Sequence, residues 1–148
     1  MFSPKKILVT TDFSSESVNA LKNAMGIAEK FGSEVYLLHV LDDINGCVAD
    51  YCLPEEHVAG AKKSLAESTA KKLKDEIQKA GSLTGVTVKE VTRFGNHIEE
   101  IIKEVQEKGI DLIVVAPHEK HKVWHVLIGH LTEELVKKSK CKILLLKK

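Results

Sequence analysis

Short runs of β-branched and aliphatic residues alternate with longer stretches of helical pattern along this sequence, and this alternation constrains the fold more than any other feature. The second run, Glu34–Leu41, holds Val35, Leu37, Leu38 and Val40 and is almost continuously apolar. Such a run is typical of an interior strand in a parallel sheet that helices cover on both faces. We expect five strands, at residues 5–11, 34–41, 86–93, 111–116 and 142–146.

Helical periodicity fills the intervals between these runs. The first helix has its apolar positions at steps of three and four and ends near Gly32. The second is long and amphipathic, over Glu55–Ala80, and we expect its apolar stripe to be buried. That stripe consists of Val58, Ala61, Leu65, Leu73 and Ile77. Two further helices are expected, one that contains residues 98–105 and one over residues 128–138.

Strict alternation of strands and helices predicts right-handed β-α-β crossovers. The expected fold class is therefore α/β, an open five-stranded parallel sheet with helices on both faces, which is Rossmann-like. We expect residues 1–148 to form a single domain. Ligands of such sheets bind beyond the carboxyl ends of the strands. The candidate segments are residues 10–12, residues 41–43, Gly95 and the residues from Ala116 onward.

The charge balance argues against two classes of partner. Lys and Arg number 22 against 21 Asp and Glu, a net charge of +1, so we expect no binding to nucleic acid or to an anionic membrane surface. The apolar runs are far shorter than the roughly 20 residues that cross a bilayer. The first residues lack the pattern of a signal peptide, so we expect a cytoplasmic protein.

The cysteines do not form a recognisable framework. Cys47, Cys52 and Cys141 are odd in number, and their spacing matches no zinc or thioredoxin pattern. We therefore expect no structural disulfide. A redox pair of Cys47 and Cys52 stays open as an alternative to unreactive thiols.

Several short motifs occur in a characteristic order. They are Ile7-Leu8-Val9-Thr10-Thr11-Asp12-Phe13-Ser14, Leu38-His39-Val40, Gly95, Asp111-Leu112-Ile113-Val114-Val115 followed by Gly129, and Cys141-Lys142-Ile143-Leu144-Leu145-Leu146. Together they resemble the universal stress protein family over nearly the whole chain. The resemblance implies the adenine nucleotide alpha hydrolase-like form of the fold, with a nucleotide pocket at the strand ends.

ATP-binding members of that family carry a G-x2-G-x9-G-S/T pattern after the fourth strand, where glycines let backbone amides approach phosphate groups. In this chain the pattern falls on Ala116, Glu119, Gly129 and His130, so one of its three glycines remains and an imidazole replaces the hydroxyl. The carboxylate of Glu119 would repel phosphate oxygens. We therefore expect no bound ATP and no cofactor.

The resemblance also assigns other residues of this chain to the family's nucleotide pocket. These are Thr11, Asp12, Val40, Gly95 and Leu131, in addition to the four residues of the glycine pattern. A crevice for a smaller ligand, AMP or a nucleoside, is the alternative to an empty pocket. Two interpretations of Asp12 stay open, a nucleotide contact implied by the resemblance and an ordinary strand-to-helix turn.

Histidines are concentrated where the family has its glycine loop. His118, His121 and His125 would share one face of a helix, and neutral imidazoles so placed can ligate zinc or copper. A solvent-exposed polar loop is the more frequent origin of such a cluster, so no metal is expected. A third interpretation is anion capture by Lys120 and Lys122 together with His125 or His130.

These features favour a protein that is not an enzyme. We expect a non-catalytic stress-response protein that acts as a homodimer and through contacts with an unidentified protein partner. The resemblance implies that the apolar strand from Lys142 to Leu146, at an edge of the sheet, forms the dimer interface. The alternatives are an adenine-nucleotide switch or slow ATPase, and metal binding between His118 and His130.

Overall fold

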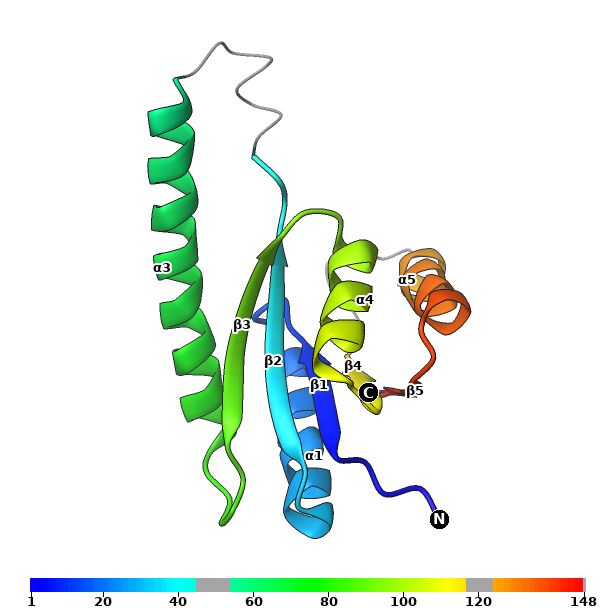
Figure 1. Ribbon diagram of the computed structural model, residues 1–148. Helices are drawn as coiled ribbons and strands as arrows, with labels where there is room; N and C mark the ends of the chain where they lie inside the picture. The colour runs from blue at the N-terminus through cyan, green and yellow to red at the C-terminus, as the bar shows by residue number, and fades with distance from the viewer. Residues whose placement is uncertain (45–53, 117–123, 148) are drawn as a thin grey trace.

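The computed structural model describes residues 1–44, 54–116 and 124–147, and for residues 124–130 it describes the helical backbone alone. The expected alternation of strands and helices is confirmed in these ranges (Figure 1). The elements are β1 Lys6–Thr10, α1 Ser15–Phe31, β2 Glu34–Leu41, α3 Glu55–Ala80, β3 Val88–Phe94, α4 His97–Lys108, β4 Leu112–Val115, α5 Trp124–Lys138 and β5 Lys142–Leu145.

The strands form one five-stranded parallel sheet in the order β3-β2-β1-β4-β5. The expected α/β fold class is therefore confirmed. Connections run outward in opposite directions from β1, to β2 on one side and later to β4 on the other. This is the topological switch point at which doubly wound sheets bind ligands, beyond the carboxyl ends of the strands.

Each face of the sheet has its own hydrophobic core. Alternate side chains of one strand point to opposite faces, so Ile7 and Val9 pack under α1 and α3, whereas Leu8 packs under α4 and α5. Full burial of each such aliphatic side chain contributes about 1.5–3 kcal/mol to folding. The two cores hold the sheet rigidly between two helical layers, and they thereby position the strand ends.

Side-chain caps and a left-handed glycine mark the helix boundaries. Ser14 caps α1 because its side chain accepts a hydrogen bond from the Ser17 amide, and Gly32 ends the helix in the left-handed conformation at φ 67°. Asn96 caps α4 in the same way, through the amide of Glu99. The stop expected at Gly32 is therefore confirmed.

The buried stripe predicted for α3 is wrong at Ala61 and Leu65, whereas Val58 is buried as predicted. Ala61 and Leu65 are exposed, and Leu65 retains 39% of its accessible surface. Figure 1 gives the reason, because α3 extends past the end of β3 and its first turns have no sheet beneath them. In the second half, Leu73 is buried as expected, and Glu76 is buried beside it.

The predicted start of the last helix is also wrong. α5 begins at Trp124, four residues before the expected residue 128, because Val126 and Leu127 extend the apolar pattern that the histidines interrupt. The final strand ends at Leu145, although the Leu146 amide still donates to the Val115 carbonyl at 3.0 Å. In the described part of the chain, the helices are too short or too polar for a membrane span.

Candidate functional site

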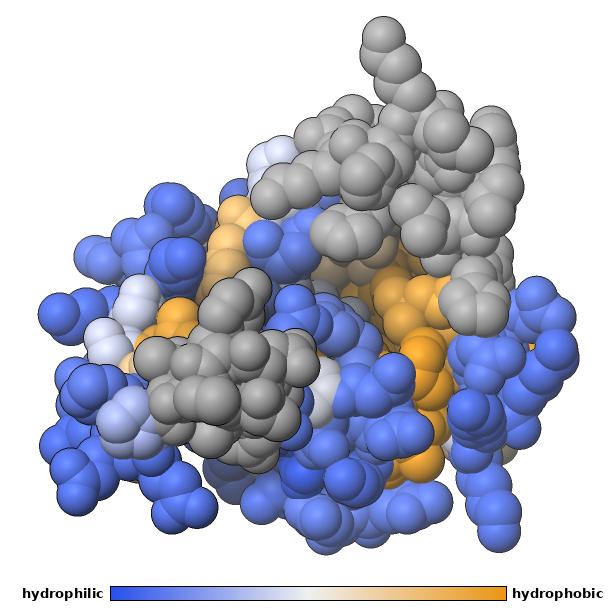
Figure 2. Space-filling view, turned by 90° about the horizontal axis from the view of Figure 1, so that it is seen from above, coloured by the Kyte–Doolittle hydropathy of each residue, from blue (hydrophilic) through white to orange (hydrophobic). Residues whose placement is uncertain are grey.

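A cavity of about 130 Å³ lies at the carboxyl ends of β1, β2 and β4, at the switch point of the sheet. Figure 2 views this end of the molecule, where apolar surface is visible between polar side chains. The apolar part of the lining is Leu38, Val40, Ile101, Val115, Ala116 and Leu131, and the polar part is Thr10, Thr11, Asp12, Ser17, His39, His97 and Thr132. A cavity that combines apolar walls with convergent polar groups is typical of a small-molecule site.

The turn between β1 and α1 forms the polar wall of this cavity. The Asp12 carboxylate accepts hydrogen bonds from the Ser17 hydroxyl at 2.7 Å and from the Ser14 amide at 3.0 Å. Phe13 adopts the left-handed conformation, φ 65°, which non-glycine residues rarely occupy. This strained residue is held because the Thr11 hydroxyl accepts a hydrogen bond from its amide at 2.9 Å.

His39 joins β2 to this turn. Its Nδ1 lies 2.8 Å from the Thr11 carbonyl oxygen, and because that oxygen can only accept, we assign the proton to Nδ1. The imidazole also packs against the Phe13 ring, with centroids 4.5 Å apart. Burial lowers the pKa of His39, against the opposing effect of the Thr11 hydrogen bond. A neutral imidazole therefore lines the cavity at neutral pH.

Glu76 reaches the same turn from α3 without lining the cavity. The Thr11 hydroxyl donates to Glu76 Oε2 at 2.6 Å. Glu76 is only 3% exposed, and its Oε1 is buried with no hydrogen-bond partner among the described residues. Burial raises the pKa of this carboxyl, the Thr11 hydrogen bond opposes the increase, and the negative charge of Asp12 adds to it.

Gly95 lies at the end of β3, where the chain turns into α4. Its amide donates to the Leu41 carbonyl at 2.9 Å, which ties this turn to the end of β2. A side chain would be strained here, because Gly95 has φ 141° and a Cβ atom would meet Glu100 Oε1 at 3.0 Å. Glycine at this position therefore reflects both the backbone conformation and the close approach of a carboxylate.

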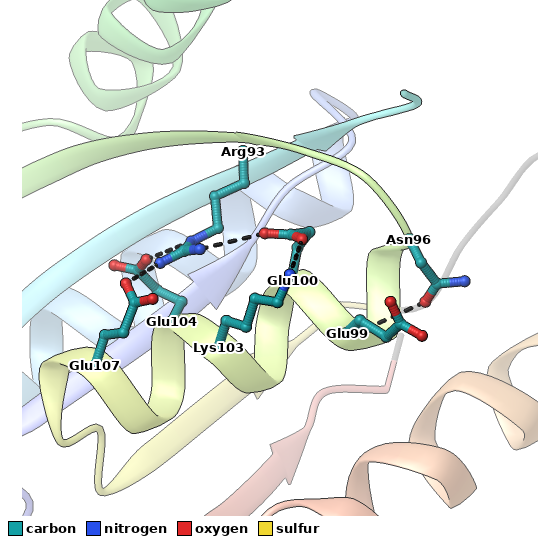
Figure 3. Close-up of polar contacts among 7 residues, drawn as sticks. All are labelled: Arg93, Asn96, Glu99, Glu100, Lys103, Glu104 and Glu107. Carbon is teal, nitrogen blue, oxygen red and sulfur yellow. Dashed lines mark hydrogen bonds and ion pairs between the residues drawn. The ribbon is translucent and has the colours of Figure 1, made fainter. Parts of the chain in front are cut away.

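That carboxylate belongs to a cluster around Arg93, shown in Figure 3. Arg93 on β3 donates to Glu104 at 2.7 Å, to Glu100 at 3.2 Å and to Glu107, all on α4. Lys103 adds a hydrogen bond to Glu100 at 2.8 Å. Burial alone would lower the pKa of Arg93, but the hydrogen bonds to the three carboxylates outweigh burial and raise it. The cluster fixes α4 to β3 next to the Gly95 turn.

The structure brings together most of the pocket residues that the sequence predicts. Thr11, Asp12, Val40, Ala116 and Leu131 all line the cavity. Gly95 does not line it but shapes the adjacent turn. Glu119 lies outside the described residues, and Gly129 and His130 are described only as part of the α5 backbone. Ligand contact by any of these residues stays a prediction.

Other residues of the site were missed by sequence reasoning. Ser17, His39 and His97 line the cavity, and Glu76 and Arg93 support its walls. The one available signal was polarity, because His39 interrupts an apolar strand and Glu76 interrupts an apolar helix stripe.

The histidine cluster cannot be placed. His118 and His121 lie outside the described residues, and His125 belongs to the part of α5 described by its backbone. Among the side chains that the structure does describe, no three His, Cys, Asp or Glu groups converge as metal ligands. Cys141 is a free thiol, whereas Cys47 and Cys52 lie outside the described ranges.

The sheet order defines a doubly wound α/β protein with a cavity at the switch point of its sheet. A sequence model of the universal stress protein family matches residues 4–147. Universal stress protein MJ0577 of Methanocaldococcus jannaschii is 33% identical over 97% of this chain and 95% of its own length. This chain belongs to the universal stress protein family.

Solved structures agree with this assignment. The structure of MJ0577 has a TM-score of 0.74 at 31% identity, and the match covers 99% of this chain and 98% of that one. A universal stress protein from Archaeoglobus fulgidus in complex with dAMP has a TM-score of 0.57 at 18% identity, covering 99% of this chain and all (100%) of that one. The second likeness concerns the fold alone.

Proposed function

We propose that this chain is a non-catalytic, ligand-responsive member of the universal stress protein family whose crevice binds an adenine mononucleotide in preference to Mg·ATP. The observation that carries the proposal is the cavity at the switch point, lined by Thr11, Asp12, Val40, Ala116 and Leu131. These residues lie just after β1, at the end of β2, just after β4 and on α5, so the fold itself assembles the site.

The lining of the cavity favours a base with its sugar. Val40, Ile101 and Leu131 offer apolar contact to a flat base. The Asp12 carboxylate, at the rim, is an acceptor suited to sugar hydroxyl groups. The family relative from Archaeoglobus fulgidus is described as holding a mononucleotide, dAMP.

A triphosphate is disfavoured by the residues that come after β4. Phosphate cradles use backbone amides that are free at the start of a helix. Gly129 and His130 lie beyond the first turn of α5, where amides donate to the carbonyls of the helix itself. Glu119 would add a negative charge in place of a glycine. Both features support a ligand with few phosphate groups.

The polar groups of the crevice support binding more than catalysis. The Ser17 hydroxyl donates to the Asp12 carboxylate, and His39 directs its Nδ1 proton to a backbone carbonyl. Among the described lining residues, no hydroxyl is hydrogen-bonded to an imidazole that would activate it as a nucleophile. We therefore propose that ligand binding changes partner choice, with no turnover.

Calorimetric titration with AMP and with Mg·ATP tests the proposal. At about 0.3 kcal/mol per non-hydrogen atom, AMP is expected to bind with Kd on the order of 10–100 µM, and Mg·ATP at least about tenfold more weakly. Ala116→Leu enlarges a side chain in the cavity wall and is expected to abolish binding. Ala61→Leu, the same change on the exposed part of α3, is the matched control. Tighter binding of Mg·ATP than of AMP, or release of phosphate from ATP, would contradict the proposal.

We also propose that β5 mediates a homodimer. β5 is an edge strand, and the amides of Lys142 and Leu146 donate toward β4. Because strand residues alternate, the amides of Ile143 and Leu145 face away from β4 and are available to a second copy. Val136 on the preceding helix, α5, is 62% exposed and offers further apolar surface to a partner.

Sedimentation velocity distinguishes this dimer from a monomer. The wild-type chain is expected to sediment as a dimer, and Ile143→Pro, which removes one outward amide, is expected to shift it toward monomer. The control is Leu65→Lys, which changes an exposed apolar residue on α3 and should leave the dimer intact. Proline is not used at this position because Leu65→Pro would break the helix. A monomeric wild-type protein would contradict the proposal.

A further inference from the structure

Thr11 occupies a junction of four parts of the fold. Its amide donates to the Leu38 carbonyl at 2.9 Å and its carbonyl accepts from His39, which ties it to β2. Its hydroxyl accepts from the amide of strained Phe13 and donates to Glu76 on α3. Because Thr11 also lines the cavity, whatever moves its hydroxyl moves the wall of the crevice.

Glu76 is an unusual residue to find at such a junction. It does not line the cavity, it is 3% exposed, and one of its carboxyl oxygens is buried without a hydrogen-bond partner among the described residues. A buried carboxylate with one hydrogen bond is costly, whereas a buried carboxylic acid is tolerated. The site therefore favours a neutral Glu76.

The surrounding charges do not favour ionisation. Asp12, in the β1–α1 turn, places a second carboxylate near Glu76. Lys79 is the nearby cation of α3, but it is exposed and pairs with Asp75 at 2.9 Å. Lys72 lies over the Phe13 ring, 5.6 Å from its centroid, and the neutral His39 faces Thr11 from β2. Among the described residues, none of these cations forms an ion pair with Glu76.

We propose that Glu76 is a positioning residue of the crevice, which in its neutral form holds the β1–α1 turn through Thr11, and whose ionisation loosens that turn and weakens mononucleotide binding. This inference rests on the proposed function for its ligand, but the positioning itself does not. An ionised Glu76 repels Asp12 and draws water or a cation toward the turn. The strained conformation of Phe13 persists only while its neighbours hold it.

The sign of the pH dependence is set by the raised pKa of Glu76. The folded protein holds a proton on Glu76 at pH values where an ordinary glutamate has lost it. The stabilisation is present in full below the ordinary glutamate pKa and is lost as pH rises through the raised value. Affinity for AMP should accordingly fall as pH rises through the same interval.

Two measurements on wild type and Glu76→Gln test the proposal. The first is the amide chemical shift of Phe13 in the ligand-free protein between about pH 4.5 and 8.5, which reports on the Thr11 hydroxyl. Wild type should show a transition with its midpoint above the ordinary glutamate range that Glu76→Gln lacks, whereas any shift caused by protonation of His39, which packs against Phe13, should appear in both proteins. Identical titration curves in the two proteins, or a wild-type-specific midpoint in the ordinary range, would overturn the proposal.

The second measurement is AMP affinity over the same pH interval, expressed as the ratio of the two proteins' Kd values so that titration of the AMP phosphate cancels. The wild-type Kd divided by the Glu76→Gln Kd should be near one at low pH. At high pH this ratio should rise at least about threefold, because only the wild type ionises at position 76 and then binds AMP more weakly. A constant ratio would overturn the link to the ligand. If AMP binds neither protein at any pH, the proposed function fails, and the Phe13 transition still decides whether Glu76 positions the turn.

A structural role alone would not produce this pattern. Glu76→Ala removes the hydrogen bond at every pH and should weaken AMP binding throughout. Glu76→Gln keeps a neutral group of the same shape that can accept from Thr11, and should restore the low-pH affinity of wild type. Equal loss in both variants would contradict the positioning role.

Discussion

Arg93 offers the sharpest test of how the wall of the crevice is held. In Arg93→Met the guanidinium is lost, and three carboxylates of α4 lose a partner. Glu107 is 60% exposed and its ion pair contributes about 0–1 kcal/mol. Glu100 keeps the hydrogen bond from Lys103. Most of the effect therefore comes from the third carboxylate, Glu104.

Glu104 is 1% exposed, and its Oε1 already lacks a hydrogen-bond partner among the described residues. Removing one member of a buried ion pair costs about 3–5 kcal/mol, because the other charge stays buried without compensation. We expect Arg93→Met to lose about 3–4 kcal/mol of unfolding free energy in urea at pH 7. Glu107→Gln, which removes the exposed pair, should lose less than about 1 kcal/mol.

A double replacement separates the ion pair from packing. Arg93→Met with Glu104→Leu replaces both charges by apolar groups of similar size, which is often neutral for stability. The double variant should regain most of the stability lost in Arg93→Met. A loss below about 1 kcal/mol in Arg93→Met, or no recovery in the double variant, would refute the reasoning.

The pH dependence has a defined sign. Hydrogen bonds from Lys103 and from Arg93 lower the pKa of Glu100. A lowered folded-state pKa contributes stability above the ordinary glutamate value, and that contribution is lost as pH falls through the lowered value. The difference between wild type and Arg93→Met should therefore stay nearly constant from pH 7 down to about pH 5 and should narrow as pH falls below about 4.3, the ordinary glutamate value. A difference that stays constant below that value too would show that lost packing, and not charge, causes the effect.

Three further predictions concern stability in urea. Gly95→Ala should cost about 2 kcal/mol or more of unfolding free energy, because alanine is strained at φ 141° and its Cβ displaces Glu100. Adding Glu100→Ala removes the steric clash and should recover only that part of the loss. Full recovery would show that the backbone conformation costs nothing. Leu73→Ala should cost about 2–5 kcal/mol and Leu65→Ala less than about 0.5 kcal/mol, since Leu73 is buried and Leu65 is exposed. Equal losses would contradict the claim that Leu65 has no sheet beneath it. Ser14→Ala should cost about 1 kcal/mol through loss of the α1 cap, whereas Ser14→Asp should not.

The fold was predictable from local sequence patterns, because the strands share one pattern of apolar runs and the helices share another of apolar residues at steps of three and four. The run at Glu34–Leu41 is almost continuously apolar. This pattern is typical of a strand that helices cover on both faces. The caps at Ser14 and Gly32 mark their helix ends by residue type. The apolar periodicity of a helix does not say how far the sheet beneath that helix extends. The stripe of α3 continues through Leu65, but the sheet that would bury it ends earlier.

The crevice was predictable only in part. Thr11 and Asp12 come after a recognisable strand, and the switch-point rule places such residues at a ligand site. Glu76 and Arg93 act through partners that lie 65 and 11 residues away in the sequence, Thr11 and Glu104 respectively. A single polar residue in a helix or strand pattern does not indicate which distant residue it will bind. The spacing of Glu100, Glu104 and Glu107 is that of one helix face, but this spacing does not identify the arginine that binds them.

The central claim is that an adenine mononucleotide binds at the switch point. The most direct test is an AMP titration monitored by backbone amide chemical shifts in two-dimensional NMR spectra of the whole chain. The account predicts that saturable shifts concentrate at Thr11, Asp12, Val40, Ala116 and Leu131, and that Mg·ATP produces the same shifts only at higher concentration. Shifts confined to other surfaces, no shifts at all, or saturation by Mg·ATP at lower concentration than by AMP would contradict it.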